Sequence, residues 1–213
     1  ATPVIGMNLD SQYQGAINKI ITLDGRGLCL RVNIEEVVKV NFNSAIQNLI
    51  RSCGVAIEQS DLIIDLRAPN FEPLGGFADL LSNIITKLPN LDLWRSLGII
   101  STSFPSSLSG LRPGLSTIPR NEWLLYKLLL TNLKKQGVRL PSFGDYAINH
   151  PDQLLVDMRL VKPNASVRYA INDGWLIAKG QNVRDYGFAQ YEDLCRKVAE
   201  SSYFSGQGFS AGD

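Results

Sequence analysis

Residues 61–88, DLIIDLRAPNFEPLGGFADLLSNIITKL, decide the fold, because they combine a short apolar run with an amphipathic segment. The run DLIIDLR has the length of a buried strand and ends in charged residues. Behind it, apolar residues recur at the helical spacing i, i+3, i+4, i+7. These residues are Phe77, Leu80, Leu81, Ile84, Ile85 and Leu88. The stretch therefore predicts one strand followed by one helix with a single buried face.

The same alternation continues on both sides of this unit. Further strands are expected near 3–8, 27–32, 97–103 and 138–146, and further helices near 44–53 and 120–136. Ser44 and Gln47 have the spacing of a capping box at the start of one helix. Alternating strands and helices predict a parallel α/β sheet. This pattern fits both an open doubly wound sheet and a (β/α)8 TIM-barrel-like fold.

The pattern changes after the last of these strands. Two β-type runs near residues 165–179 are joined by Asn172, Asp173 and Gly174, which predicts an antiparallel hairpin. Residues 104–119, FPSSLSGLRPGLSTIP, are expected to form a long loop, a type of segment that often serves as a lid or binding loop. A last helix is predicted to bury Tyr191, Leu194, Cys195 and Val198. With no internal repeat and no linker, we expect a single domain over 1–213.

Composition excludes several classes of protein. The 21 Lys and Arg residues balance the 20 Asp and Glu residues, so the chain has no strong nucleic-acid signal. No apolar run is long enough to span a bilayer. The three cysteines have no CxxC or Cys/His spacing, which favours buried thiols in a cytoplasmic protein over disulfides or a zinc site. We therefore expect a cytoplasmic protein without a membrane partner.

Several familiar functional motifs are absent from the sequence. It contains no GxGxxG, GxxxxGK[ST] or HExxH. The one histidine, His150, lies between Asn149 and Pro151, where bracing a turn is favoured over catalysis. Glu122 lies near a predicted helix start, where a carboxylate stabilises the helix dipole. The metal and the cofactor, if any, stay unknown.

Polar residues gather where the predicted parallel strands end. They are Arg31, Asp65, Arg67, Ser101, Ser103, Asp145 and Tyr146. Ligands bind at the carboxyl ends of parallel strands in both architectures. The arginines would hold a phosphorylated small molecule together with Ser103 and Tyr146. Asp65 and Asp145 would act as catalytic bases or metal ligands.

A structural interpretation explains the same residues. Asp65 would pair with Arg67, and Arg31 with Asp145, so that the charges neutralise one another in an ion-pair lattice. Arg168 and Lys179 flank the predicted hairpin and would either extend a ligand-binding rim or remain solvated to deter edge pairing. The sequence leaves these alternatives open.

Seven stretches together resemble a known family. They are DLRAPNFEP, TSFPSSLSG, RNEWLLYKLL, FGDYAINHPD, DMRLVKPNASVRYAINDGWLIAKG, GFAQYEDLC and FSAGD. In this order they resemble the beta protein family, named after a phage protein, along nearly the whole chain from Pro3. The resemblance implies a complete (β/α)8-like barrel. Relative to that barrel we expect the chain to lack the first strands and a C-terminal segment.

The resemblance implies little about a reaction. Similar proteins occur in phage and in bacterial anti-phage defence neighbourhoods, which implies a role in phage–host conflict. Our first hypothesis is a barrel mouth that binds or processes a phosphorylated or nucleotide-like ligand. The alternative is a non-catalytic scaffold that binds a protein partner of a defence system. Whether the chain is an enzyme stays open.

Overall fold

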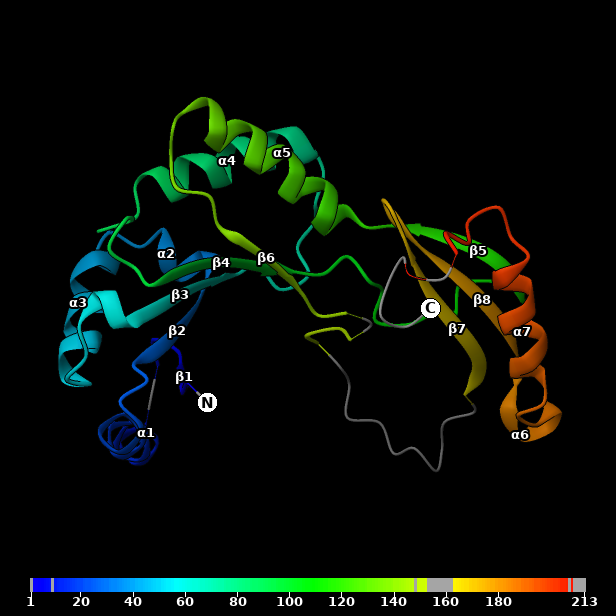
Figure 1. The fold of residues 1–213 in the computed structure, drawn as a ribbon, viewed down its shortest axis with the longest axis horizontal. Coiled ribbons are helices and arrows are strands. Elements are labelled where there is room, and N and C mark those ends of the chain that lie inside the picture. The colour runs from blue at the N-terminus through cyan, green and yellow to red at the C-terminus, as the bar shows by residue number, and fades with distance from the viewer. Residues whose placement is uncertain (1, 9, 148, 153–162, 207, 209–213) are drawn as a thin grey trace. The chain divides into compact units, whose positions relative to one another are not determined.

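A computed structural model describes residues 2–8, 10–147, 149–152, 163–206 and 208. Backbone contacts divide the chain into two compact units (Figure 1). The first unit contains residues 1–102 and 124–146, and the second contains 103–123 and 147–213. We call them the parallel unit and the antiparallel unit after their sheets. The single domain expected from the sequence stays a prediction.

The parallel unit is built on a five-stranded sheet in which all neighbouring strands run parallel. Its strands are β1 (Val4–Ile5), β2 (Leu28–Asn33), β3 (Ser60–Asp65), β4 (Ser96–Ser101) and β6 (Ser142–Asp145). Its helices are α1 (Ser11–Asp24), α2 (Ile34–Val37), α3 (Phe42–Ser52), the 3-10 turn η1 (Ile57–Gln59), α4 (Leu74–Thr86) and most of α5 (Asn121–Lys135). The parallel α/β sheet predicted from the sequence is confirmed.

The order of the strands separates the two predicted architectures. The sheet runs β1-β2-β3-β4-β6, so each successive parallel strand adds to the same edge. A doubly wound sheet instead returns to its centre and reverses direction. The described strands are therefore singly wound, as barrel strands are, but they form no closed ring. Closure into a (β/α)8 barrel stays a prediction.

Strand register separates a helix-covered face from a second face of this sheet. Leu30 pairs with Leu62, and Leu62 with Leu97, so these three side chains share one face. They are buried in one core with Ile46 of α3, Leu81 of α4 and Leu129 of α5. Residues one position along each strand, including Arg31 and Ile63, point to the opposite face.

The antiparallel unit contains a three-stranded sheet in the order β5-β8-β7. Its strands are β5 (Gly114–Pro119), β7 (Asn164–Ile171) and β8 (Gly174–Asn182). The predicted hairpin is confirmed, with Asn172 and Asp173 as the turn between β7 and β8. Helices α6 (Val183–Tyr186) and α7 (Gln190–Ala199) follow, and Leu194 and Val198 of α7 bury against Leu176 of β8.

Three local predictions were wrong, and one helix was missed. Residues 114–119 of the expected loop form β5, because β8 supplies a partner strand that no local pattern reveals. Ser44 lies inside α3, where its hydroxyl donates to the carbonyl of Asn41, so it caps no helix. The capping box instead joins Asn33 and Glu36 at α2. Cys195, which was predicted to be buried, is exposed on α7, and helix α1 was not predicted.

Within the described ranges, no helix is both long and apolar enough to cross a bilayer.

Candidate functional site

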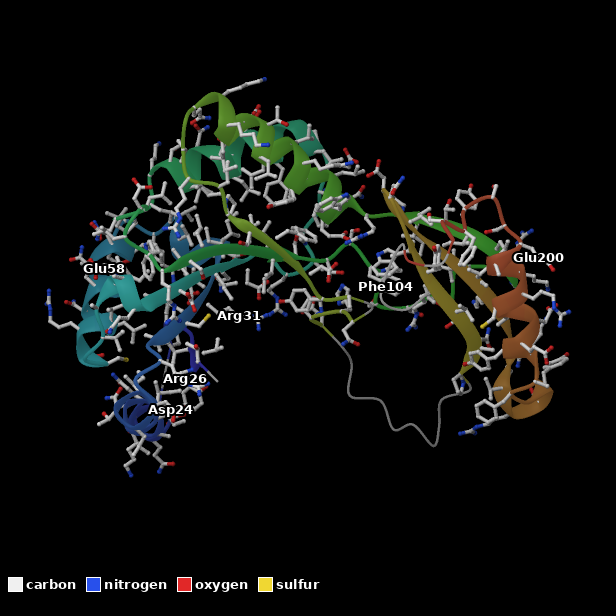
Figure 2. All side chains as sticks on the ribbon, viewed as in Figure 1. Asp24, Arg26, Arg31, Glu58, Phe104 and Glu200 are labelled. Atoms are coloured by element: carbon white, nitrogen blue, oxygen red, sulfur yellow. The ribbon has the colours of Figure 1, made fainter. Side chains whose placement is uncertain are left out.

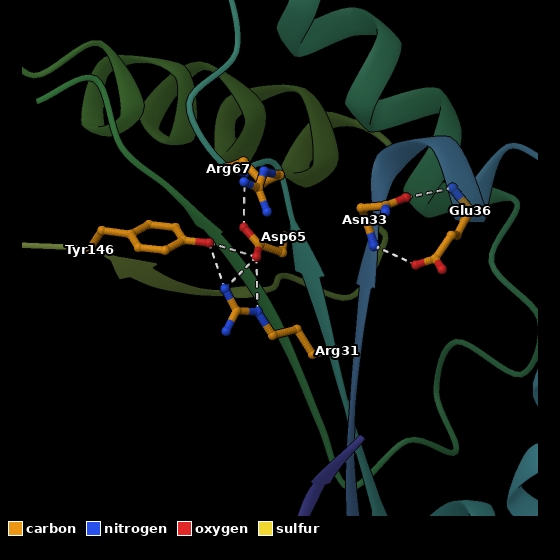
Figure 3. A network of polar contacts seen from close by, with 6 residues as sticks. All are labelled: Arg31, Asn33, Glu36, Asp65, Arg67 and Tyr146. Atoms are coloured by element: carbon orange, nitrogen blue, oxygen red, sulfur yellow. Dashed lines mark hydrogen bonds and ion pairs between the residues drawn. The ribbon is translucent and has the colours of Figure 1, made fainter. Parts of the chain in front are cut away.

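Arg31, Asp65 and Tyr146 meet at the carboxyl end of the parallel sheet (Figure 3). Nε and Nη2 of Arg31 donate to Oδ2 of Asp65 at 2.8 and 2.5 Å. The Tyr146 hydroxyl donates to the same Oδ2 at 2.6 Å and accepts from Arg31 Nη2 at 2.5 Å. The strands β2 and β3 and the end of β6 thus bring three predicted site residues together.

Asp65 is the centre of this cluster. It is only 5 % exposed, and its second oxygen, Oδ1, accepts from the backbone N–H of Arg67 at 2.8 Å. That bond holds Arg67 in the left-handed region, at a φ of 58° that a non-glycine residue seldom adopts. Both carboxylate oxygens are therefore engaged, which suits a positioning role better than that of a general base or metal ligand.

The guanidinium of Arg31 is hydrogen-bonded through Nε and Nη2, and the side chain is partly exposed to solvent. Its side chain is 42 % exposed, and within the described part of the chain its Nη1 has no hydrogen-bond partner. Arg95 provides a contrast at the amino end of the same sheet. Its Nε and Nη2 donate to Asp61, and its Nη1 donates to the carbonyl of Arg26. All three side-chain nitrogens of Arg95 are thus engaged, as expected of a structural arginine, whereas Nη1 of Arg31 remains available to a ligand.

The hydroxyl of Tyr146 is held in its protonated form. Burial and the hydrogen bond to Asp65 raise the pKa of Tyr146 to about 12, from an ordinary value of 10.0. Ionised Asp65 stabilises the neutral phenol because it accepts the phenol's proton and would repel a phenolate.

Between pH 10 and about 12, the free energy of unfolding is expected to fall less in Tyr146→Phe than in the wild type. In the wild type the unfolded tyrosine loses its proton near pH 10.0 and the folded one near pH 12. The folded state thus holds more protons in this window, so its stability is complete below pH 10 and declines as pH rises toward 12. Urea denaturation across this range measures the slope. Tyr13→Phe is the control, because Tyr13 is 46 % exposed and its hydroxyl donates to the backbone carbonyl of Val4. Equal slopes for wild type and Tyr146→Phe would contradict the assignment.

Asp145 and Asp65 do not share a face of the sheet. Asp145 pairs with Ser101, whereas Asp65 pairs with the preceding residue, Ile100. Successive strand residues point to opposite faces, so the side chains of Asp65 and Asp145 leave the sheet on opposite faces. No group of three or more His, Cys, Asp or Glu side chains suited to a metal was found in the described ranges. The catalytic roles of both aspartates stay predictions.

The remaining predicted residues, Ser103, Arg168 and Lys179, belong to the antiparallel unit. The Ser103 hydroxyl donates to Oε2 of Glu122, and Arg120 Nε donates to Oε1 at 3.1 Å. Glu122 is 3 % exposed, so it forms a buried ion pair in addition to lying at a helix start. Local spacing does not predict this cluster, because Ser103 lies 19 residues before Glu122 in the chain.

Arg168 and Lys179 lie on neighbouring strands of the antiparallel sheet. The Arg168 guanidinium lies over the ring of Phe104, 5.4 Å from its centroid. Phe104, labelled in Figure 2, packs edge-on against Trp175 at 5.7 Å. Lys179 is 6 % exposed rather than solvated, and its Nζ donates to the carbonyls of Leu108 and Leu111 at 2.7 and 2.6 Å.

His150 has the structural contact expected of a turn residue. Its Nδ1 accepts a hydrogen bond from the backbone N–H of Asp152 at 3.1 Å. This bond closes the turn that contains Pro151.

Comparison with known proteins identifies the family. The model of the family described as "Beta protein" matches residues 1–213, the whole chain. No curated protein and no solved structure matches the chain. Two of the three residues of the cluster formed by Arg31, Asp65 and Tyr146 lie in motifs that carried the resemblance, namely Asp65 and Tyr146. Since the match covers every residue, the chain belongs to the beta protein family.

Proposed function

We propose that the parallel unit binds a phosphorylated small molecule at the carboxyl end of its sheet, with Arg31 as the anion-binding residue. The observation that carries this proposal is the half-open guanidinium of Arg31, whose Nη1 has no partner in the described structure. Asp65 and Tyr146 hold the other side of the same group at 2.5 to 2.8 Å.

Preorganisation is the physical reason for this assignment. A guanidinium held in place loses less conformational freedom when it binds phosphate than a freely moving side chain does. Charge-assisted bonds to phosphate are also about twice as strong as neutral ones. Asp65 is a positioning residue in this proposal, since it acts on the ligand through Arg31.

The location supports the same proposal. Ligands of parallel α/β proteins bind outside the carboxyl ends of the strands. Arg31 and Asp65 both lie near those ends, on the face opposite the helix-covered core. The sequential strand order also supports a barrel, in which this face would line the interior.

A scaffold that binds a protein partner is the second candidate. The side chain of Phe188 is 76 % exposed and stacks on Tyr191, with ring centroids 6.3 Å apart. Exposed aromatic residues are enriched in protein interfaces. A setting in phage–host conflict rests on family membership alone and stays a prediction for either candidate.

Thermal denaturation with nucleotides and sugar phosphates tests the proposal. A ligand at about a hundred times its Kd adds about 2.7 kcal/mol to the free energy of unfolding, or roughly 5–10 °C in Tm for a chain of this size. Arg31→Lys is expected to remove most of that shift, because lysine keeps the charge but lacks the fork that Asp65 orients.

Arg95→Lys is the matched control. It makes the same change in a second Arg–Asp pair, at the amino end of the sheet, and is expected to leave the ligand-induced shift intact. If both variants lose the shift equally, or if no phosphorylated compound stabilises the folded wild type, the Arg31 cluster is an ion-pair lattice. The scaffold would then be the better interpretation.

A further inference from the structure

The antiparallel unit contains a second cavity with the chemistry of an anion site. Its volume is about 390 Å³. Among the described residues, its lining includes two cationic side chains, three serines and one asparagine, and no acidic side chain. These polar residues are Ser107, Ser109, Asn164, Ser166, Arg168 and Lys179.

Lys179 is the strongest feature of this cavity. Its side chain is almost fully buried, yet its contacts in the described structure are two backbone carbonyls, those of Leu108 and Leu111, and no carboxylate. An ammonium group has three donors, and two are used here. A buried cation without a counter-ion is costly, so an anion at the third donor would stabilise it.

Strand geometry directs other donors to the same place. Ser166 is paired with Lys179 across β7 and β8, and Arg168 lies two residues further along β7. All three side chains therefore share one face of the sheet. The opposite face is covered by Leu194 and Val198 of α7.

Arg168 is oriented without losing its hydrogen-bonding capacity. Its guanidinium lies over the ring of Phe104, which is 2 % exposed and packs edge-on against Trp175, and its side chain forms no hydrogen bond or ion pair in the described part of the chain. A cation–π contact restrains the plane of the guanidinium and leaves its N–H groups available. Ser107 also has a defined position, because its Oγ accepts from the backbone N–H of Ser109 at 3.1 Å.

We infer that this cavity binds a phosphate group, either as free phosphate or on a small phosphate ester. Tetrahedral phosphate accepts hydrogen bonds on several sides, which suits two cations and several hydroxyls around one cavity better than a planar carboxylate does. The site needs no residue of the parallel unit, so it is independent of the function proposed for Arg31.

Titration calorimetry with inorganic phosphate, at constant ionic strength, tests this site directly. Arg168→Gln is expected to weaken phosphate binding about tenfold, since it removes one charge-assisted contact. Ser166→Ala is a milder change in the same part of the lining, on β7, and is expected to weaken phosphate binding severalfold. Glycerol 3-phosphate in place of phosphate distinguishes an ester site, which binds it as tightly, from a site for the free ion, which rejects it.

Two controls locate the effect. Arg196→Gln removes an exposed arginine of α7 that pairs with Glu192, and Arg95→Lys alters an ion pair of the parallel unit that lies outside the Arg31 site. Both are expected to bind phosphate at this cavity like the wild type. Absence of phosphate binding by the folded wild type would overturn the inference, as would wild-type affinity in both Arg168→Gln and Ser166→Ala. A loss in Arg31→Lys alone would assign phosphate to the other site and equally overturn this one.

Discussion

Replacing Gly27 with alanine is expected to destabilise the protein by at least about 3 kcal/mol. A Cβ at this position would lie 1.9 Å from the backbone carbonyl oxygen of Gln59, and Gly27 has a φ of +74°. The left-handed conformation costs a side chain roughly 1–2 kcal/mol. The overlap adds more, because a backbone atom cannot move aside without shifting the start of β3 against β2. Urea denaturation followed by circular dichroism measures the loss.

Gly25 provides a matched control two residues earlier. It also has a positive φ, of +61°, but an added Cβ would meet nothing within 4 Å. Gly25→Ala is therefore expected to cost about 1 kcal/mol, from backbone conformation alone. Similar losses for the two variants would show that the close approach to Gln59 is not what Gly27 is needed for.

Asp65→Ala is expected to lower the free energy of unfolding by about 3 kcal/mol, because hydrogen bonds to a charged group contribute roughly 1.5–3 kcal/mol each and a buried carboxylate that accepts several of them is lost. Arg31 and Tyr146 lose their shared acceptor, and the N–H of Arg67 loses the bond that holds its unusual φ. Asp65→Asn should lose less, because its amide oxygen can still accept from Arg67. The same denaturation measurement applies.

Asp61→Ala is the control for this pair. Asp61 also accepts two bonds from an arginine, Arg95, but its side chain is 19 % exposed against 7 % for Asp65. Pairs nearer to solvent contribute about 1 kcal/mol or less. If Asp61→Ala costs as much as Asp65→Ala, burial is not what makes the Asp65 cluster important.

A ligand that stabilises Asp65→Asn as strongly as it stabilises the wild type would also be informative. It would show that Arg31 binds the phosphate without being positioned by Asp65. The proposed function and the positioning role of Asp65 therefore have separate tests.

Local pattern alone determined the strands and helices around residues 61–88. The buried run became β3, and Leu81 and Ile85 of the periodic segment are fully buried in α4. Periods of two and 3.6 residues are properties of a short stretch, so the sequence reveals them without knowledge of the partner elements. The same holds for the hairpin turn at Asn172 and Asp173.

Contacts between distant residues required the tertiary structure. The ion-pair lattice considered from the sequence would pair Arg31 with Asp145, yet Arg31 binds Asp65, 34 residues away, and Tyr146, 115 residues away. Strand β5 formed from an expected loop because β8 pairs with it, and Lys179 became buried because residues 108–111 cover it. The sequence by itself determined the parallel strands, the long helices between them, the hairpin and the polar residues at strand ends, but it revealed neither α1 nor β5. Only the tertiary structure decided which of those residues meet, because register between strands places side chains on one face or the other and is set by packing across the whole sheet.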